Sequence, residues 1–266
     1  MGIIFSVTMI ILGFIGSFFS GLLGIGGGII NYPLLLFVPP SLGIASFTAQ
    51  EVSGISMFQV FFASLAGVIA FSRKSKKSKN ASLIHKGLVF NMGSGILLGS
   101  LLGGYVSRFL SGDSINIIYG VLAIVAVVLM VIPNKGKQQH EDLDNISYNR
   151  IIAIVAAFLT GIVSGIVGAG GAFILIPIML TVLKIPTRTT IASSLAIVFI
   201  SAVGGVIGKI TGGPIPLMPT IFTVIGSVIG APFGSRISAK INVKYLRYAL
   251  VVLIAGTAVK VWMSIL

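Results

Sequence analysis

Residues 20–33 read SGLLGIGGGIINYP, and residues 164–177 read SGIVGAGGAFILIP. The second stretch repeats the first one 144 positions later without a gap, and seven positions carry the same residue in both copies. A glycine-broken segment that recurs in both halves of an apolar chain is typical of secondary transporters and marks their binding site. The repeat therefore predicts a chain of two related halves, each with one glycine break.

The composition predicts an integral membrane protein. Hydrophobic residues make up 56% of the 266 positions and charged residues only 9%. Soluble domains carry about 25% charged residues, so this chain cannot cover a globule with a polar surface. Long apolar runs have the length of helices that cross a hydrocarbon core of roughly 30 Å, and we expect an all-α fold. The eight expected long spans are 3–23, 52–71, 87–106, 115–132, 151–168, 190–208, 215–234 and 248–259.

The polar residues exclude several functions. The chain has no cysteine, which rules out disulfides, iron–sulfur clusters and thiol catalysis. Its apolar spans offer almost no His, Asp or Glu, so we expect neither an enzyme nor a bound metal or cofactor. The net charge of +13 lies in loops, where it anchors helices at the cytoplasmic face, and no nucleic acid partner is expected. The first span is not read as a cleaved signal peptide, because it ends in one copy of the repeat.

The likeness between the halves extends beyond the opening motif. Each half has the same expected order: a helix, a glycine break, a short apolar piece at 28–38 or 172–183, and three more helices. We expect a first membrane repeat at 1–132, a cytoplasmic linker at 133–149 and a second membrane repeat at 150–266. The further matching stretches are 54–57 with 192–195, 67–69 with 205–207, and 99–103 with 226–230.

The basic residues arbitrate between two topologies. The short pieces have 11 and 12 residues, too few to span comfortably at 1.5 Å per residue. If each one returns as a hairpin, the halves are inverted, and fifteen basic residues lie inside with three outside. A parallel arrangement would leave eleven inside and seven outside. The positive-inside rule favours inverted-topology repeats in the plasma or inner membrane, with both termini outside. The count leaves open whether the hairpins cross fully or re-enter.

The glycine breaks predict an anion site. Consecutive glycines let the backbone leave helical geometry, and a helix that restarts after them presents free N–H groups and a positive dipole end. Such an end binds anions without a buried cation. Inverted hairpins would bring the two ends together near the midplane. The substrate-binding candidates are Gly26, Gly27, Gly28, Gly170, Gly171, Ser20, Ser164, Ser53, Ser56, Ser193, Ser194 and Asn31.

Other glycines recur at spacing four, a pattern typical of close helix packing in membranes. We expect packing rather than binding at Gly13, Gly16, Gly99, Gly103, Gly226 and Gly230.

The paired motifs at 20–28 and 164–172, each followed by a proline, resemble the sulfite exporter (TauE/SafE) family of membrane transporters. The stretch Ala192-Ser193-Ser194-Leu195-Ala196 does so too, and the resemblance covers nearly the whole chain. Members of that family are implicated in moving sulfur-containing anions such as sulfite, sulfoacetate or thiosulfate, and related organic acids. The resemblance implies a substrate of that kind. In the first half, Gly54-Ile55-Ser56-Met57 departs from the family's small–Thr/Ser–Ser–Leu pattern, which bears on the substrate rather than on the family.

Three residues are candidates for coupling or gating. Glu51 is the acid that stands next to an apolar span, and such acids carry protons or pair with cations in transporters. It could equally satisfy N–H groups at the start of its helix. Gln50 and Arg188 occupy matching entrances in the two halves, and Arg188 is either an anion contact or an interfacial anchor. Lys209 follows an apolar span and is expected to extend to the outer surface.

Together these features predict a secondary transporter that moves a small anion by alternating access. The expected partners are that anion and the membrane lipids. An anion channel is the alternative, because opposed helix ends can also form a filter. Transport of a non-sulfur organic acid is a second alternative. The residues leave open coupling to protons or another ion, the direction of transport and the oligomeric state.

Overall fold

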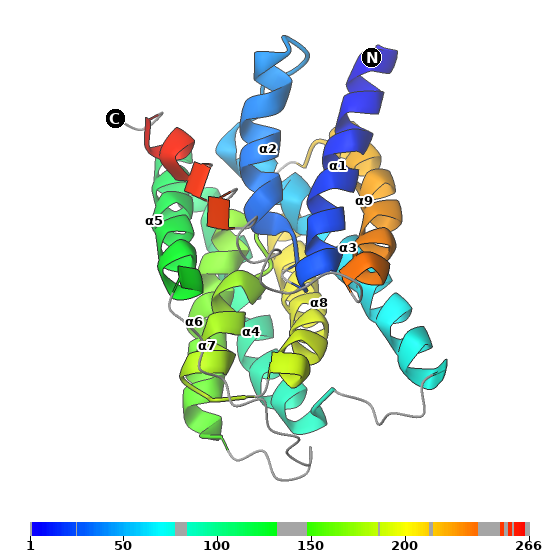
Figure 1. The fold of residues 1–266 in the computed structure, drawn as a ribbon. Coiled ribbons are helices and arrows are strands. Elements are labelled where there is room, and N and C mark those ends of the chain that lie inside the picture. Colours follow the sequence, from blue (N-terminus) through cyan, green and yellow to red (C-terminus); the bar gives the residue numbers. More distant parts are fainter. Residues whose placement is uncertain are drawn as a thin grey trace.

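The described part of the chain folds into helices. The computed structural model describes residues 2–24, 26–77, 84–131, 148–185, 187–212, 215–238, 251–252, 255–256 and 258–263. Within these ranges no strand is present. In chain order the elements of Figure 1 are α1 (Ile3–Leu23), α2 (Gly28–Ser41), α3 (Ala49–Lys77), α4 (Lys86–Val106), the 3₁₀ turn η1 (Ser107–Phe109), α5 (Gly112–Val131), α6 (Arg150–Val167), α7 (Ala172–Thr181), α8 (Thr187–Gly212) and α9 (Leu217–Ser238).

Six helices are long and apolar enough to cross a membrane, namely α1, α3, α4, α6, α8 and α9. They coincide with six of the eight expected spans. The fourth expected span forms α5, whose apolar stretch is shorter and covers Gly112–Val125. Half of the run 248–259 lies outside the described residues. The two short pieces are helices of 14 and 10 residues, α2 and α7, as the sequence predicted.

The chain turns back at each glycine break. Figure 1 shows α1 and α2 as a hairpin at the end that carries the N-terminus, and α6 and α7 as a hairpin that enters from the opposite end. Both first helices end on a glycine in the left-handed region, Gly24 at φ 71° and Gly168 at φ 80°. Residues other than glycine rarely adopt this backbone conformation. The repeated glycines therefore stop each first helix and allow the reversal.

Glycines also lie in the two most extensive helix–helix interfaces, which join α1 to α9 and α4 to α6. A Cβ atom on these glycines would overlap a backbone carbonyl of the facing helix, so the helix backbones touch directly. The packing expected at Gly99, Gly103, Gly226 and Gly230 is confirmed. The pairs on one side are Gly226 with Ile10, Gly230 with Phe14 and Gly234 with Phe18; those on the other are Gly95 with Ile154, Gly99 with Phe158 and Gly103 with Ile162.

These contacts correct one alignment between the halves. Ile10 and Ile154 are equivalent residues of the two halves, because they lie 144 positions apart like the two motifs. Ile10 contacts Gly226 and Ile154 contacts Gly95, so these two glycines are equivalent as well. The glycines of α4 at 95, 99 and 103 therefore match those of α9 at 226, 230 and 234. The pairing of 99–103 with 226–230 that the sequence suggested is wrong by one helical turn.

The two central helices, α3 and α8, cross with reciprocal contacts. A Cβ on Gly67 would lie 2.6 Å from Leu195 Cδ2, and one on Gly205 would lie 2.5 Å from Met57 Sδ. Residues 57 and 195, like 67 and 205, are separated by 138 positions, so each contact is the counterpart of the other. Because a later residue of one helix faces an earlier residue of the other, α3 and α8 run antiparallel.

Candidate functional site

The two glycine breaks meet inside the helix bundle. A Cβ atom on Gly28 would lie 2.6 Å from the carbonyl carbon of Ala169, so the backbones of the two breaks are in contact. One side chain touches both breaks: Val198 Cγ1 lies 2.6 Å from the Cβ position of Gly26 and 3.2 Å from that of Gly170. The convergence that the repeat predicted is therefore present.

Each break leads into a helix whose N-terminus has no side-chain cap. The N-cap residues are Gly27 at φ 68° and Gly171 at φ 76°, and they precede α2 and α7. Within the described ranges, the N–H groups of Gly26, Gly27, Gly170 and Gly171 donate no hydrogen bond. A buried N–H without an acceptor is costly, and the positive end of the helix dipole lies at the same place. This combination is suited to an anion.

Serine hydroxyls lie beside both breaks. The Oγ of Ser164 is buried and has no hydrogen-bond partner among the described residues, and its Cβ lies 3.3 Å from the Cβ position of Gly171. Its counterpart Ser20 is 2% exposed, with Oγ 3.3 Å from the Cβ position of Gly27. Ser56 Oγ is also buried, with no partner in the described part of the chain. A hydroxyl can donate to an anion, so these three side chains remain candidates.

The other predicted serines have structural partners. Ser53 Oγ on α3 donates to the carbonyl of Ile166 at 2.6 Å, at the end of α6. Ser194 Oγ on α8 donates to the carbonyl of Gly24 at 3.1 Å, at the end of α1. Each half thus supports the glycine break of the other half. Ser193 Oγ accepts the backbone N–H of His85 at 3.2 Å, which places it at the start of α4.

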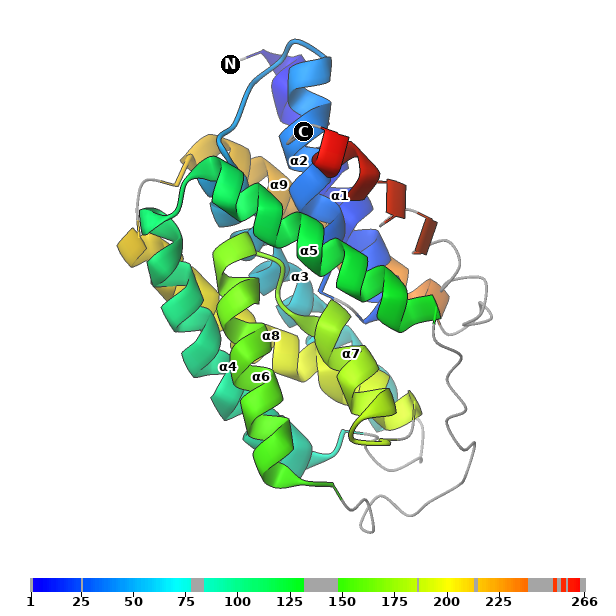
Figure 2. The same ribbon diagram turned by 90° about the vertical axis from the view of Figure 1, so that its left-hand side faces the viewer.

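Polar side chains that the sequence did not single out hold α2 in place. Tyr119 Oη on α5 donates to the carbonyl of Ile29 at 2.7 Å, and its ring stacks on Tyr32 with centroids 4.7 Å apart. Asn31, which the sequence predicts as a substrate-binding candidate, also packs its side-chain amide against Gly16 of α1. Figure 2 shows α5 running obliquely across the near side of the molecule. An aromatic contact of this kind carries no sequence signal, because its two residues are 87 positions apart.

Comparison with known proteins identifies the family. The profile of the family described as Sulfite exporter TauE/SafE matches residues 9–261. The chain belongs to the sulfite exporter TauE/SafE family. It is a multi-pass membrane transporter and not an enzyme.

Similar TauE/SafE proteins occur in bacteria and archaea. A probable membrane transporter protein of Bacillus subtilis, YunE, is 25% identical over 253 residues, which cover 90% of each chain. A probable membrane transporter protein of Methanocaldococcus jannaschii, MJ0441, is 27% identical over 254 residues, covering 91% of this chain and 90% of that protein. No solved structure matches this TauE/SafE chain.

Two of the coupling candidates in this TauE/SafE transporter take part in local structure. Glu51 Oε2 accepts the N–H and the Oγ1 of Thr48 at 2.8 and 3.0 Å, and its own N–H donates back to Thr48 Oγ1 at 3.2 Å. This capping box is the helix-start arrangement that the sequence allowed for. Gln50 Nε2 donates to the carbonyl of Leu110 at 2.8 Å. The side chain of Arg188 lies outside the described residues.

The expectation for Lys209 is wrong. It is 5% exposed, and its Nζ donates to Ser107 Oγ at 2.7 Å and to the carbonyl of Ile166 at 2.9 Å. The ammonium therefore points into the TauE/SafE fold instead of extending to the outer surface. A lysine near the end of an apolar helix gives the same sequence pattern in both cases, so only its acceptors decide.

Proposed function

We propose that this TauE/SafE protein is a secondary transporter that moves a small anion across the cell membrane by alternating access. The anion is a sulfur oxyanion or an organosulfonate, such as sulfite, thiosulfate or sulfoacetate. One observation carries the proposal: the uncapped N-termini of α2 and α7 meet inside the bundle, with Gly28 against the backbone of Ala169.

Elementary electrostatics supports an anion at this place. Each helix N-terminus carries roughly half a positive charge, so two facing ends attract about one negative charge. The N–H groups of Gly26, Gly27, Gly170 and Gly171 and the hydroxyls of Ser20 and Ser164 supply donors from both halves. Oxyanions present several acceptor oxygens, and hydrogen bonds to charged oxygens are the stronger ones. Among oxyanions, we propose those of sulfur because the family is described as Sulfite exporter TauE/SafE.

The proposal includes two inverted halves, residues 1–132 and 150–266, joined by a linker at 133–149. It is supported by the antiparallel crossing of the equivalent helices α3 and α8 and by the opposite entry of the two hairpins in Figure 1. Helices related by an axis in the membrane plane must run in opposite directions. Rocking one half against the other would then expose the central site alternately to the two sides.

The charge distribution supports an orientation. The starts of α4 and α6 lie at the end of the bundle away from the N-terminus, and they carry Lys86 and Arg150. The positive-inside rule places this end in the cytoplasm and both termini outside.

Counterflow in proteoliposomes tests the proposal. Labelled sulfite or thiosulfate would be exchanged in the presence of unlabelled sulfonates, sulfate, carboxylates or phosphate. We expect saturable exchange that sulfur anions block. Flux without saturation or counterflow would favour the channel, and competition by carboxylates alone would favour a non-sulfur organic acid. A dependence of uptake on a proton or sodium gradient would identify the coupling ion. No exchange with any of these anions, in folded protein, would overturn the proposal.

A further inference from the structure

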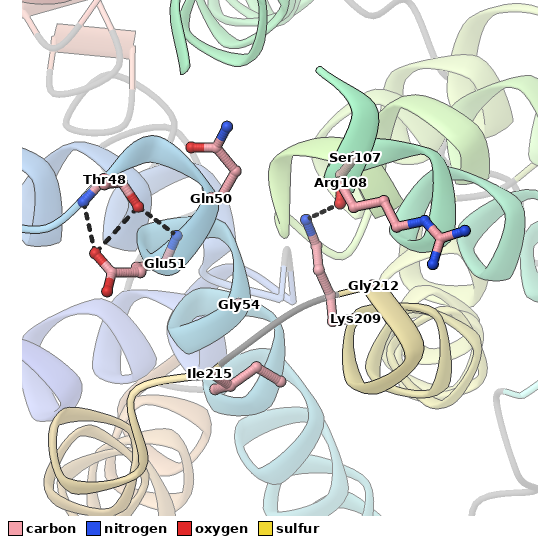
Figure 3. A pocket seen from close by; sticks show the side chains of 9 residues that line it. All are labelled: Thr48, Gln50, Glu51, Gly54, Ser107, Arg108, Lys209, Gly212 and Ile215. Carbon is pink, nitrogen blue, oxygen red and sulfur yellow. Dashed lines mark hydrogen bonds between the residues drawn. The ribbon is translucent and has the colours of Figure 1, made fainter. Parts of the chain in front are cut away.

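A cavity of about 380 Å³ lies away from the meeting point of the two breaks. It opens between the first turn of α3, the turn η1, the end of α8 and the segment before α9 (Figure 3). Its walls include Thr48, Glu51, Ser107, Arg108, Lys209 and Ile215. The volume is that of a small ligand site, and none of the predicted glycine or serine residues of the central site line it.

Lys209 is a buried cation in the wall of this cavity. Both acceptors of its Nζ, Ser107 Oγ and the carbonyl of Ile166, are uncharged. Ser107 Oγ in turn donates to the carbonyl of Gly104 at 2.7 Å, so its hydroxyl hydrogen is already used. An ammonium carries three N–H donors, and two have acceptors among the described residues. A charge removed from water needs a counter-charge, and neutral oxygens compensate it only in part.

The other charges of the cavity do not supply that counter-charge. Glu51 lies on the opposite wall in Figure 3, and its carboxylate is held by Thr48 in the capping box. The guanidinium of Arg108 lies 3.9 Å from the ring centre of Tyr105, and Figure 3 shows it pointing away from Lys209. Two cations and one carboxylate therefore line the cavity, and the excess positive charge lies on the Lys209 side.

We propose that this cavity is an anion-binding site in which Lys209 Nζ binds a small oxyanion of the sulfate or sulfonate class. The third N–H of Lys209 donates to the anion, whose charge balances the buried ammonium. Ile215 and the aliphatic stem of Lys209 give the site an apolar side, which suits the carbon end of a sulfonate.

Residues that line the cavity are in contact with residues of the second glycine break. Ile166, whose carbonyl accepts Lys209, precedes Gly168 by two residues, and a Cβ on Gly168 would lie 2.9 Å from the carbonyl carbon of Ser53. Gly54, the next residue of α3, lines the cavity. An anion at Lys209 thus occupies the outer approach to the central site. This last step rests on the proposed function, whereas anion binding in the cavity does not.

Charged thiol reagents measure the potential in the cavity directly. The native chain has no cysteine, so Ile215→Cys provides a single reactive thiol on the cavity wall. Its labelling rate would be compared for an anionic ethylsulfonate and a cationic trimethylammonium methanethiosulfonate at low ionic strength. We expect Lys209→Met to lower the anionic-to-cationic rate ratio by about tenfold, because one unit charge acts on both reagents with opposite sign. Ser46→Cys, exposed in the loop between α2 and α3, serves as the control and should keep its ratio. An unchanged ratio at 215 would overturn the proposal.

Protection by anions tests binding itself. Sulfate or methanesulfonate, replaced by gluconate at constant ionic strength in the control, should slow labelling of Ile215→Cys by the neutral methyl methanethiosulfonate at least threefold. Lys209→Arg should retain the protection and Lys209→Met should lose it. Absence of protection with native Lys209 refutes the site, even if the Met variant does not fold. Protection that persists while counterflow fails would instead count against the proposed transport function alone.

Discussion

Replacing Gly28 with alanine should separate the two glycine breaks while leaving the helices intact. The added Cβ would lie 2.6 Å from the carbonyl carbon of Ala169, whereas carbon atoms in contact are about 3.5–4.0 Å apart. The hairpins must therefore move apart by about 1 Å or more. Gly28 is the first residue of α2 and has no positive φ, so alanine suits its backbone. Overpacking costs about 1–3 kcal/mol, and the better helix propensity of alanine offsets about 1 kcal/mol of that.

The effect on anion binding should be much larger. Hydrogen bonds require donor and acceptor within about 3.2 Å, so a displacement of this size prevents one anion from reaching the N–H groups of both helices. Hydrogen bonds to charged groups contribute about 1.5–3 kcal/mol each, so losing two weakens binding by about 3–6 kcal/mol. At about 1.4 kcal/mol per factor of ten, affinity should fall at least about 100-fold.

The assay is anion competition of counterflow in proteoliposomes, with thermal unfolding in detergent as the check on folding. Gly112→Ala is the matched control, since Gly112 is the first residue of α5 and its Cβ would meet Ala49 Cβ at an ordinary 3.6 Å. It should leave competition unchanged. If the Gly28→Ala protein unfolds at the temperature of the native chain and anions compete in its counterflow as they do in the native chain, the two breaks do not bind one anion together.

Three further outcomes are expected. Thr48→Ala removes the hydroxyl of the capping box at the start of α3 and should lower the free energy of unfolding by about 1 kcal/mol, measured by denaturant titration. Gly103→Ala places a Cβ on a carbonyl of α6, so it should lower the melting temperature far more than Gly112→Ala; equal melting temperatures would show that α4 and α6 are not tightly packed. Single cysteines at Ser46 and Arg150 should react with impermeant reagents from opposite sides, 150 from the cytoplasm, and reaction from one side would exclude the proposed topology.

The meeting of the glycine breaks could be predicted because the motif repeats at a fixed spacing and contains consecutive glycines. A backbone with repeated positive φ ends a helix in any surroundings, so local chemistry decides the reversal. Ser53 and Ser194 are predicted to bind substrate, and the structure gives them a further role. Their hydroxyls bind carbonyls of the opposite half, and a sequence does not show which carbonyl a serine reaches.

The alignment of α4 with its equivalent helix α9 could not be predicted, because their glycine spacing is ambiguous. Glycines at 95, 99 and 103 and at 226, 230 and 234 repeat every four residues, so an alignment shifted by one turn matches almost as well. The contacts with equivalent residues of α1 and α6, such as Ile10 and Ile154, distinguish the two alignments. Lys209 is a similar case, because burial depends on acceptors that come from η1 and α6.

The contact of α1 with α9 bears on how the protein is made. Helix α1 ends at Leu23 and α9 ends at Ser238, so 215 further residues must be synthesised before the partner of α1 is complete. At about 5–20 residues per second, the ribosome needs roughly 10–40 s for this. During that time the glycine face of α1 is in the lipid without its partner. The N-terminal helix therefore has to remain inserted without its α9 partner until residue 238 has been synthesised, and the two halves complete their fold together instead of one after the other.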